Sequence, residues 1–270
     1  MSRRVTAGID GSPESRAAAD WAAAEALRRS TGLRLVHGWG VASPLEPMGS
    51  PEVDQQASEQ VLREARDRLV SGHPGLDVTT ESVAGGPAAA LLDAARESDV
   101  VVLGSRGLGT VAGFLLGSVS MQTVAWAECP VVVVRSGAAE RAPEQPAPEV
   151  VLGLKRLEKP DREVLDFAFA EASLRGLPLR VVHVRRDPAP VASQVAGALQ
   201  PWRERYPEQE VDETVMTGQA SEVLLDATPS AEMVVVGRGG RRGGLGTRTG
   251  PVGHALLHHA ACPVAVVPHG

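Results

Sequence analysis

A glycine-rich pattern occurs twice in this chain of 270 residues, and its second occurrence lies 133 residues after the first. The shared landmarks are Gly104, Gly107, Gly117 and Ser118 in the first copy, and Gly237, Gly240, Gly250 and Pro251 in the second. Earlier segments match with an offset near 145, so the chain is expected to be a tandem repeat. We predict one domain at 1–137 and a second at 149–270. The Pro-, Ala- and Glu-rich stretch at 138–148 is typical of a linker.

Strand and helix signals alternate within the first copy. Strands are predicted at 4–9, 33–39, 78–84, 100–103 and 131–134, and helices at 13–30, 51–69, 88–97 and 118–126. Ser12 and Pro13 are the expected N-cap and first residue of the first helix, and Gly32 is expected to stop it. Alternation of this kind predicts an α/β fold: a doubly wound parallel sheet with helices on both faces.

Composition excludes several classes of partner and location. The net charge is −6 and aromatic residues make up 3% of the chain, so neither a basic nor a base-stacking surface for nucleic acid is expected. No apolar run reaches the roughly 18 residues of a membrane helix, and the first residues do not resemble a secretion signal. Two cysteines, Cys129 and Cys262, fit a reducing compartment, and we therefore expect a cytoplasmic protein.

The glycine pattern predicts an anion site. It begins where a predicted strand ends and leads into a predicted helix at Ser118, whose first backbone N–H groups and dipole favour a phosphate. The spacing matches neither a Walker A loop nor Gly-x-Gly-x-x-Gly, which disfavours a dinucleotide. A glycine-rich connection without a ligand is the alternative, and the repetition of the pattern favours the ligand.

The spacing Gly-x₂-Gly-x₉-Gly-Ser, seen at Gly104 to Ser118, resembles the ATP-binding signature of the universal stress proteins. The opening segment 5–15 and the Cys-Pro-Val-Val-Val-Val ending at Cys129 are similar to the same family, and the resemblance covers nearly the whole chain as two copies. It implies five-stranded parallel sheets of order 3-2-1-4-5 with ATP, together with Mg²⁺, at the strand ends. It also implies that the last strands of the two copies pair as an intrachain pseudo-dimer. It leaves open a homodimer of whole chains and an unidentified protein partner.

The same resemblance implies which residues contact the nucleotide. In the first copy they are Gly8, Asp10, Gly38, Gly104, Ser105, Arg106, Gly107, Leu108, Gly109, Thr110, Gly117, Ser118 and Val119. In the second copy they are Gly153, Val184, Gly237, Arg238, Gly240, Gly250 and Val252. Gly38 stands where the family often has Val, which leaves less apolar wall for adenine.

The second copy departs from the signature at two positions. Lys155 replaces Asp10, and Pro251 replaces Ser118, which removes one N–H donor and one hydroxyl. The arginines of the second loop could clamp phosphates instead: Arg238, Arg241, Arg242 and Arg248. A solvated, arginine-rich loop is the alternative interpretation, so occupancy of the second site stays open.

Other polar and aromatic residues are interpreted as structural. His254 and His258 have the spacing of a metal pair, but no third ligand has suitable spacing, and with His259 they are interpreted as a helix face, so no metal is expected. His37 and His183 are interpreted as packed strand-end histidines, and both cysteines as small buried residues. The tryptophans are interpreted as packing residues: Trp21, Trp39, Trp126 and Trp202.

The residues favour a binding protein over an enzyme. No nucleophile–base–orienter set is found, so no catalytic residue is assigned, and the leading hypothesis is an ATP-dependent stress-response sensor or regulator without strong catalysis. One alternative is slow ATP hydrolysis or phosphoryl transfer, with Asp10 orienting Mg²⁺ or water. Another is a scaffold in which the nucleotide is only structural.

Overall fold

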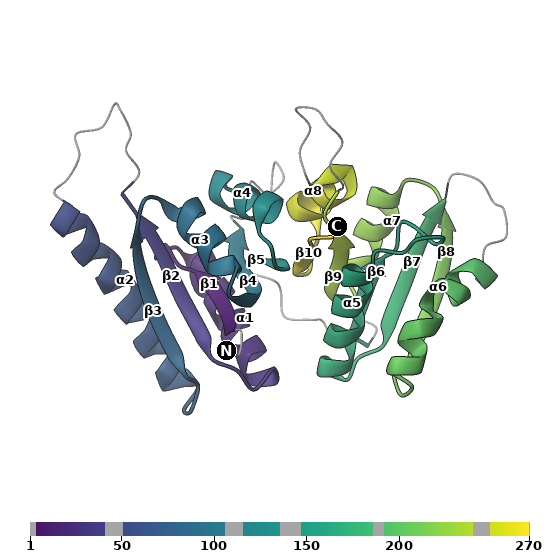
Figure 1. The fold of residues 1–270 in the computed structure, drawn as a ribbon, viewed down its shortest axis with the longest axis horizontal. Helices are drawn as coiled ribbons and strands as arrows, with labels where there is room; N and C mark the ends of the chain where they lie inside the picture. The colour runs from purple at the N-terminus through teal and green to yellow at the C-terminus, as the bar shows by residue number, and fades with distance from the viewer. Residues whose placement is uncertain are drawn as a thin grey trace. The chain divides into compact units, whose positions relative to one another are not determined.

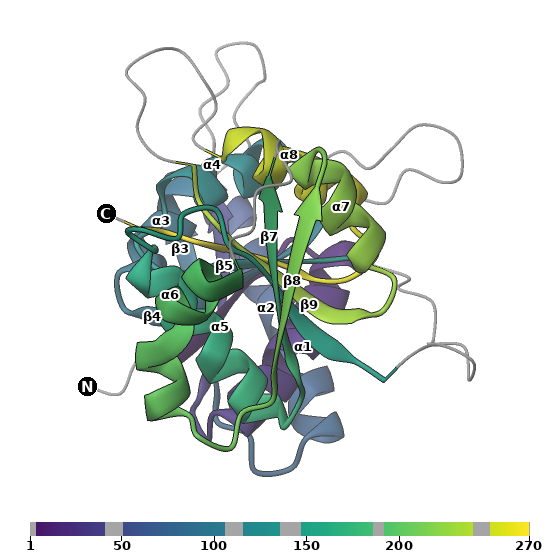
Figure 2. The same cartoon turned by 90° about the vertical axis from the view of Figure 1, so that its right-hand side faces the viewer.

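The chain divides into two compact units, Met1–Ser136 and Gly137–Gly270, and each is considered by itself (Figure 1). The computed structural model describes residues 4–40, 51–105, 116–135, 147–185, 192–239 and 249–269. Both units are α/β domains in which helices cover a parallel sheet (Figure 2). The doubly wound fold class predicted for both copies is confirmed.

The first unit alternates strands and helices along its whole length. Its elements are β1 (Arg4–Gly8), α1 (Pro13–Arg28), β2 (Leu33–Trp39), α2 (Pro51–Gly72), β3 (Val78–Ala84), α3 (Pro87–Ala95), β4 (Ser98–Ser105), α4 (Ser118–Trp126) and β5 (Val131–Arg135). The sheet order is β3-β2-β1-β4-β5, and all of its pairings are parallel. The expected order 3-2-1-4-5 is therefore confirmed.

The second unit repeats this arrangement. Its elements are β6 (Glu149–Gly153), α5 (Arg162–Arg175), β7 (Leu179–Arg185), α6 (Ala192–Arg205), β8 (Val211–Thr217), α7 (Ala220–Ala227), β9 (Ala231–Gly237), α8 (Gly250–His259) and β10 (Val264–Val267). The order β8-β7-β6-β9-β10 is again parallel throughout. The pairing of the last strands of the two copies stays a prediction.

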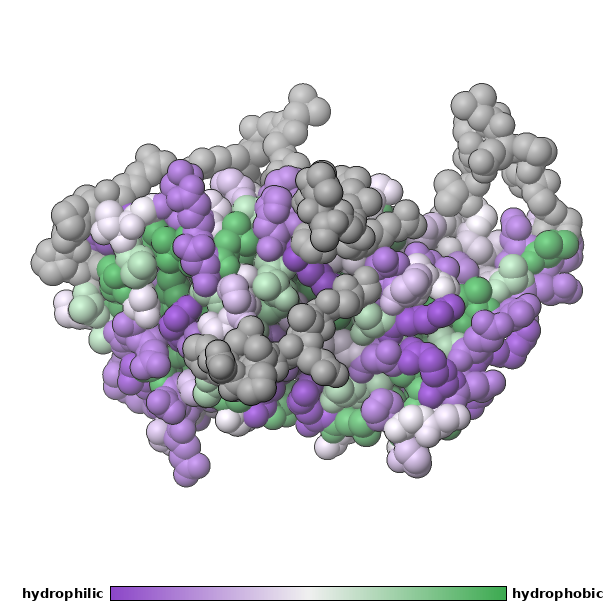
Figure 3. All heavy atoms as spheres, turned by 180° about the vertical axis from the view of Figure 1, so that it is seen from behind, coloured by the Kyte–Doolittle hydropathy of each residue, from purple (hydrophilic) through white to green (hydrophobic). Residues whose placement is uncertain are grey.

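The core of each unit lies on both faces of its sheet. Val100–Leu103 in β4 and Val131–Val134 in β5 are buried along their whole length, as strands covered by helices on both faces must be. α1 presents a stripe of fully buried alanines to the sheet, and their small side chains let the helix lie close to it. Hydrophilic residues predominate over much of the surface drawn in Figure 3.

A buried ion pair is repeated in the two units. Glu25, with no exposed surface, accepts from Arg29 Nε at 2.6 Å on α1, and Glu171 pairs with Arg175 at the corresponding place on α5. The pair spans one helical turn in both units. The duplication therefore extends to a buried charged contact that hydrophobic patterning did not indicate.

The ends of α1 test the expected capping signals. Ser12 is the N-cap, and its Oγ accepts from the Ser15 amide at 3.1 Å, as predicted. The expectation that Gly32 stops the helix is wrong. The chain turns at Ser30 (φ 52°), which is left-handed, and the Thr31 amide closes the turn on the Ala26 carbonyl at 2.9 Å.

Candidate functional site

The carboxyl ends of β1 and β4 form the switch point of the first unit. The two strands are neighbours in the sheet, but β1 leads through α1 to β2 on one side and β4 leads through α4 to β5 on the other. Connections that leave in opposite directions open a crevice beyond the strand ends, where α/β proteins bind ligands. Gly8 ends β1, and Gly104 lies next to the end of β4, so both lie at this edge, as predicted from the sequence.

Helices pack tightly against two of the strand ends. A Cβ placed on Gly104 would lie 2.4 Å from the Glu14 carbonyl at the start of α1, and one on Gly38 would lie 2.4 Å from the Pro87 Cα at the start of α3. Both distances are far below van der Waals contact, so only glycine fits at these positions. The missing side chain at Gly38, interpreted above as a smaller wall for adenine, therefore has a packing cause.

The start of α4 is open at this edge. Its N-cap, Gly117 (φ −62°, ψ 156°), carries no side chain to cap the first amides, and an added Cβ would meet no atom of the described residues within 4 Å. Ser118 and Val119 form the first turn, and the Ser120 hydroxyl donates to the Gly104 carbonyl at 3.5 Å. The first amides of α4 thus lie beside the end of β4, which is the arrangement expected for a phosphate site.

Ser105 supplies a second sign of a ligand. It is the last residue of β4 and only 1% exposed, yet its hydroxyl has no hydrogen-bond partner among the described residues. A buried hydroxyl without a partner costs free energy, so such groups in native proteins generally meet another polar group, an ion or water. Ser105 is one of the contacts predicted from the family signature.

Asp10 follows β1 and shapes the turn into α1. Its Oδ1 accepts from the Ser12 amide at 3.0 Å and from the Ser12 hydroxyl. Near it, burial lowers the pKa of His37, while the Asp10 charge and a hydrogen bond to the Ser58 backbone oppose that shift. His37 therefore favours its neutral form.

The second unit places the corresponding residues at the same edge but with different contacts. Gly153 ends β6, and Val184 lies near the end of β7. Gly237 and Arg238 stand at the end of β9, where a Cβ on Gly237 would lie 2.9 Å from the His269 ring.

The first turn of α8 differs from that of α4. Gly250 has a left-handed backbone (φ 66°), whereas Gly117 is extended. Pro251 follows it in the first turn and lacks an N–H, and Val252 comes next. The second copy therefore offers one fewer donor, in a different backbone geometry.

Two histidines of the second unit have structural contacts. His183 Nδ1 donates to the Leu154 carbonyl at 2.8 Å, in keeping with its interpretation as a packed strand-end residue. The His269 side chain is 6% exposed and lies 3.4 Å from Asp161 Oδ1, which also accepts from Arg156 at 2.7 Å. The sequence repeat did not indicate this cluster, because the cluster brings together His269, after β10, and residues of the loop after β6.

Several predicted contacts lie outside the described residues. They are Arg106, Gly107, Leu108, Gly109 and Thr110 of the first loop, and Gly240, Arg241, Arg242 and Arg248 of the second. In the part of the chain that is described, no group of three or more His, Cys, Asp or Glu side chains could hold a metal ion. None of the described helices combines the length and apolar character needed to cross a bilayer.

The tryptophans differ in exposure. Trp126, at the end of α4, is 54% exposed and lies outside the core. Trp202 is buried, and its Nε1 donates to Asp166 Oδ1 at 2.9 Å. Cys129 and Cys262 are both buried.

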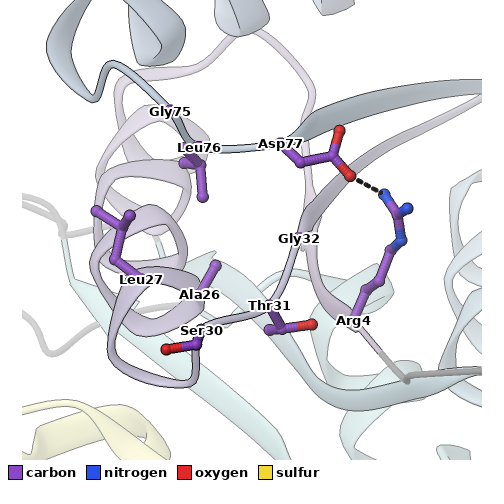
Figure 4. A pocket seen from close by; sticks show the side chains of 9 residues that line it. All are labelled: Arg4, Ala26, Leu27, Ser30, Thr31, Gly32, Gly75, Leu76 and Asp77. Atoms are coloured by element: carbon purple, nitrogen blue, oxygen red, sulfur yellow. Dashed lines mark ion pairs between the residues drawn. The ribbon is translucent and has the colours of Figure 1, made fainter.

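A surface hollow of about 460 Å³ lies at the opposite edge of the first sheet (Figure 4). Its lining consists of Arg4, Ala26, Leu27, Ser30, Thr31, Gly32, Gly75, Leu76 and Asp77. Arg4 and Asp77 form an ion pair of 3.0 Å along one side of it (Figure 4). Because it adjoins the amino ends of the strands, it contains none of the residues predicted to contact a nucleotide.

Comparison with known proteins gives matches over both copies. A family model described as the universal stress protein family matches residues 1–135 and 149–268. Universal stress protein Rv2005c of Mycobacterium tuberculosis is 35% identical over 285 residues, which cover 97% of this chain and 96% of that protein. A crystal structure of a universal stress protein from Archaeoglobus fulgidus shares the fold, with a TM-score of 0.74 at 18% identity over 99% of this chain and 98% of its own. A universal stress protein crystallised in complex with cAMP covers 50% of this chain and 99% of its own, at 30% identity and a TM-score of 0.39.

Proposed function

The chain belongs to the universal stress protein family, and we propose that it is a cytoplasmic, ATP-dependent stress-response regulator whose first copy binds the nucleotide. The proposed site is the carboxyl edge of the first sheet. Its ligand contacts come from the ends of β1, β2 and β4 and from the first turn of α4. Binding, rather than turnover, is the proposed activity.

The observation that carries the proposal is a pair of polar features at the switch point for which the described residues supply no side-chain partner. The uncapped start of α4 offers amide donors, and the buried Ser105 hydroxyl lies at the end of the adjacent β4 without a partner among the described residues. A phosphate oxygen would accept from both kinds of donor. Around the Cβ position of Gly117 the described residues leave space that a phosphate could fill.

Asp10 fits a supporting role toward a magnesium ion on the phosphates. It supplies a carboxylate at the end of β1, and Mg²⁺ bound with nucleotides usually takes one or two carboxylates together with phosphate oxygens. When bound, the ion would neutralise phosphate charge.

The contacts of Ser12 favour binding over catalysis. Its hydroxyl donates to Asp10 and accepts from the Ser15 amide at 3.1 Å, so it serves as the cap of α1. A nucleophile would need a hydroxyl free to attack a phosphate and a base to take its proton. Ser12 is therefore not available as a nucleophile, and hydrolysis of labelled ATP tests whether the site supports slow turnover by water instead.

The proposal is tested by denaturing the purified full chain, identifying any released nucleotide, and then titrating the emptied protein with ATP, AMP and cAMP by calorimetry. Gly117→Ala is the informative variant, because its methyl group meets no atom of the described residues but would enter the proposed phosphate space. We expect ATP affinity to fall by at least about tenfold, or about 1.4 kcal/mol.

Gly72→Ala is the matched control. Gly72 ends α2 at the other edge of the sheet, and its Cβ also meets no atom within 4 Å. The control should bind ATP like the original protein. Equal ATP affinity in a folded Gly117→Ala variant would overturn the phosphate assignment. Stability that depends on bound nucleotide, without any change in partners, would favour the scaffold alternative.

The second copy is expected to bind ATP more weakly than the first. Loss of one phosphate donor at Pro251 costs roughly 1–3 kcal/mol, or about one to two decades in affinity. Any compensation by the arginines of the second loop should decline with added salt, because exposed charges are screened. Calorimetry of the original protein at low and high salt should show the second site as a separate, weaker binding event, and strong, salt-insensitive binding there would contradict this expectation.

A further inference from the structure

Lys155 holds in the second unit the position that Asp10 holds in the first. Each residue lies two positions beyond the first strand of its sheet, β6 and β1. The residue before each donates its amide to the neighbouring strand at 2.9 Å, in the pairs Ile9 to Val36 and Leu154 to Val182. Since the backbone leaves the two strands alike, one switch point has an aspartate where the other has a lysine.

The ammonium group of Lys155 has no partner within the described part of the chain. Lys155 is exposed, and no hydrogen bond or ion pair joins it to a described residue. Asp10, by contrast, accepts from the Ser12 amide at 3.0 Å and so shapes the turn into α1. The turn into α5 uses other residues, since its N-cap, Asp161, accepts from Arg156 at 2.7 Å. The charge of Lys155 is therefore available to a ligand.

A buried hydroxyl at the start of α8 also lacks a partner among the described residues. Thr249 is the N-cap of this helix and 2% exposed, and its Oγ1 makes no hydrogen bond to any of them. A Cβ on Gly250, the next residue, would lie 3.6 Å from the Gly239 Cα, so α8 starts beside the end of β9. Because β9 neighbours β6, Thr249 and Lys155 belong to one edge of the sheet. Such a hydroxyl generally meets another polar group, an ion or water.

The two neighbouring strand ends of this edge are basic as well. Arg185 ends β7, whereas Trp39 ends β2. Arg238 follows β9, at the place that Ser105 has at the end of β4. Both arginines have other contacts, so no direct contact with a ligand is assigned to them. Since the whole chain has a net charge of −6, a basic residue at each of three adjacent strand ends is a local feature, and it favours an anionic ligand.

We propose that the carboxyl edge of the second unit binds a phosphate chain without a divalent metal ion, with Lys155 as the counter-charge. This extends the proposed function to the second copy and rests on it. In the first unit, the Asp10 carboxylate suits a magnesium ion that also binds the phosphates. At Lys155 an ammonium group repels such an ion but attracts phosphate oxygens directly as a point charge. Added Mg²⁺ should therefore strengthen ATP binding at the first edge and weaken it at the second.

The test is calorimetric titration of the full chain with ATP and with inorganic tripolyphosphate, first in metal-free buffer and then with excess Mg²⁺ at equal ionic strength. The variant is Lys155→Asp, which introduces the side chain that the first unit uses. In metal-free buffer the original protein should bind both anions, and the variant should lose at least about tenfold in affinity, because hydrogen bonds to charged groups are strong. Binding of ATP but not of tripolyphosphate, or second-site affinity that rises with Mg²⁺, would overturn the proposal.

Lys159→Asp is the matched control, because Lys159 is an exposed lysine of the same loop, four positions later. The control should bind both anions like the original protein. An equal loss in the two variants would show that only the overall surface charge matters, and it would overturn the role of Lys155. Both substitutions are at exposed positions, so the melting curves of the two variants should match that of the original protein.

Nuclear magnetic resonance separates this inference from the proposed function. Tripolyphosphate in metal-free buffer should first shift the amide signals of Leu154 and Gly250 in the second unit. ATP with Mg²⁺ should first shift those of Ser118 and Val119 in the first unit. If the second-unit signals alone stay unchanged, the metal-free site is wrong; if the first-unit signals alone stay unchanged, the ATP site proposed for the first copy is wrong.

Discussion

Replacing Gly38 by alanine should destabilise the first unit, although the change adds only one methyl group. The new Cβ would lie 2.4 Å from Pro87 Cα, 2.7 Å from Pro87 N and 2.8 Å from Gly86 C, and all three are backbone atoms. Since carbon atoms pack at about 3.5–4.0 Å, the start of α3 must move by about 1 Å. Overpacking of this kind costs about 1–3 kcal/mol, and the lower entropy of the unfolded alanine chain returns about 0.4–1 kcal/mol.

At the middle of these ranges the net loss is about 1.3 kcal/mol, which should lower the melting temperature of the first unit by roughly 4–6 °C, as scanning calorimetry can measure. Gly72→Ala is again the control, because its added methyl group meets open space and should leave the transition within about 0.5 kcal/mol of the original. If Gly38→Ala melts at the same temperature as the control, then α3 does not press on β2 and the packing explanation for this glycine is wrong.

Three further predictions follow from the same structure. Ser30 and Gly176 (φ 62°) both have a left-handed backbone, which glycine adopts more easily than serine. Ser30→Gly should therefore stabilise the first unit by about 0.5–1 kcal/mol, and Gly176→Ser should destabilise the second by a similar amount. Melting temperatures that do not shift in opposite directions would contradict this. Burial holds the pKa of the His37 side chain below its ordinary 6.5 in the folded protein, so the unfolded chain binds the imidazole proton more readily. The free energy of unfolding should therefore be higher above pH 6.5 and should fall as the pH drops below that value. His37→Gln should remove this fall in unfolding curves measured against pH. Pairing of Val131–Val134 with Val264–Val267 predicts slow amide hydrogen exchange on the outward edges of both strands in the full chain, and rapid exchange on either edge would refute it.

Elements whose limits depend on local chemistry could be predicted from the sequence. β3 and α4 have the predicted bounds, Val78–Ala84 and Ser118–Trp126, because glycines stand beside them: Gly85 follows the strand and Gly117 precedes the helix. Because the sequence pattern is repeated, the same order of strands and helices could be predicted for the second unit. The positions of Gly8 and Gly104 at one sheet edge follow from the βαβ order alone.

Features that depend on distant contacts could not be predicted. α1 ends in a turn at Ser30, a non-glycine residue with a left-handed backbone. Because helices usually end at glycine, the sequence pointed to Gly32 instead. Gly38 is explained by the backbone of Pro87, and the place of His269 is explained by Asp161, both far away in sequence. Tryptophan is a large apolar residue of the kind expected in a core, but Trp126 lies on an exposed face of α4.

Comparing the two copies distinguishes the features that the fold shares from the residues that differ at the proposed binding edge. Both units keep the strand order, the helix faces and even a buried Glu–Arg pair, so these features are what the fold requires. They differ where packing sets no constraint: the extended start of α4 at Gly117 against the left-handed start of α8 at Gly250, and Met121 and Ala125 against the histidine pair of α8. Because the proline of the second copy removes an amide donor that packing does not need, the fold survives the loss of that donor. The nucleotide proposed for the first copy therefore depends on features that the fold itself does not require, and a variant that weakens nucleotide binding, such as Gly117→Ala, should leave the fold intact.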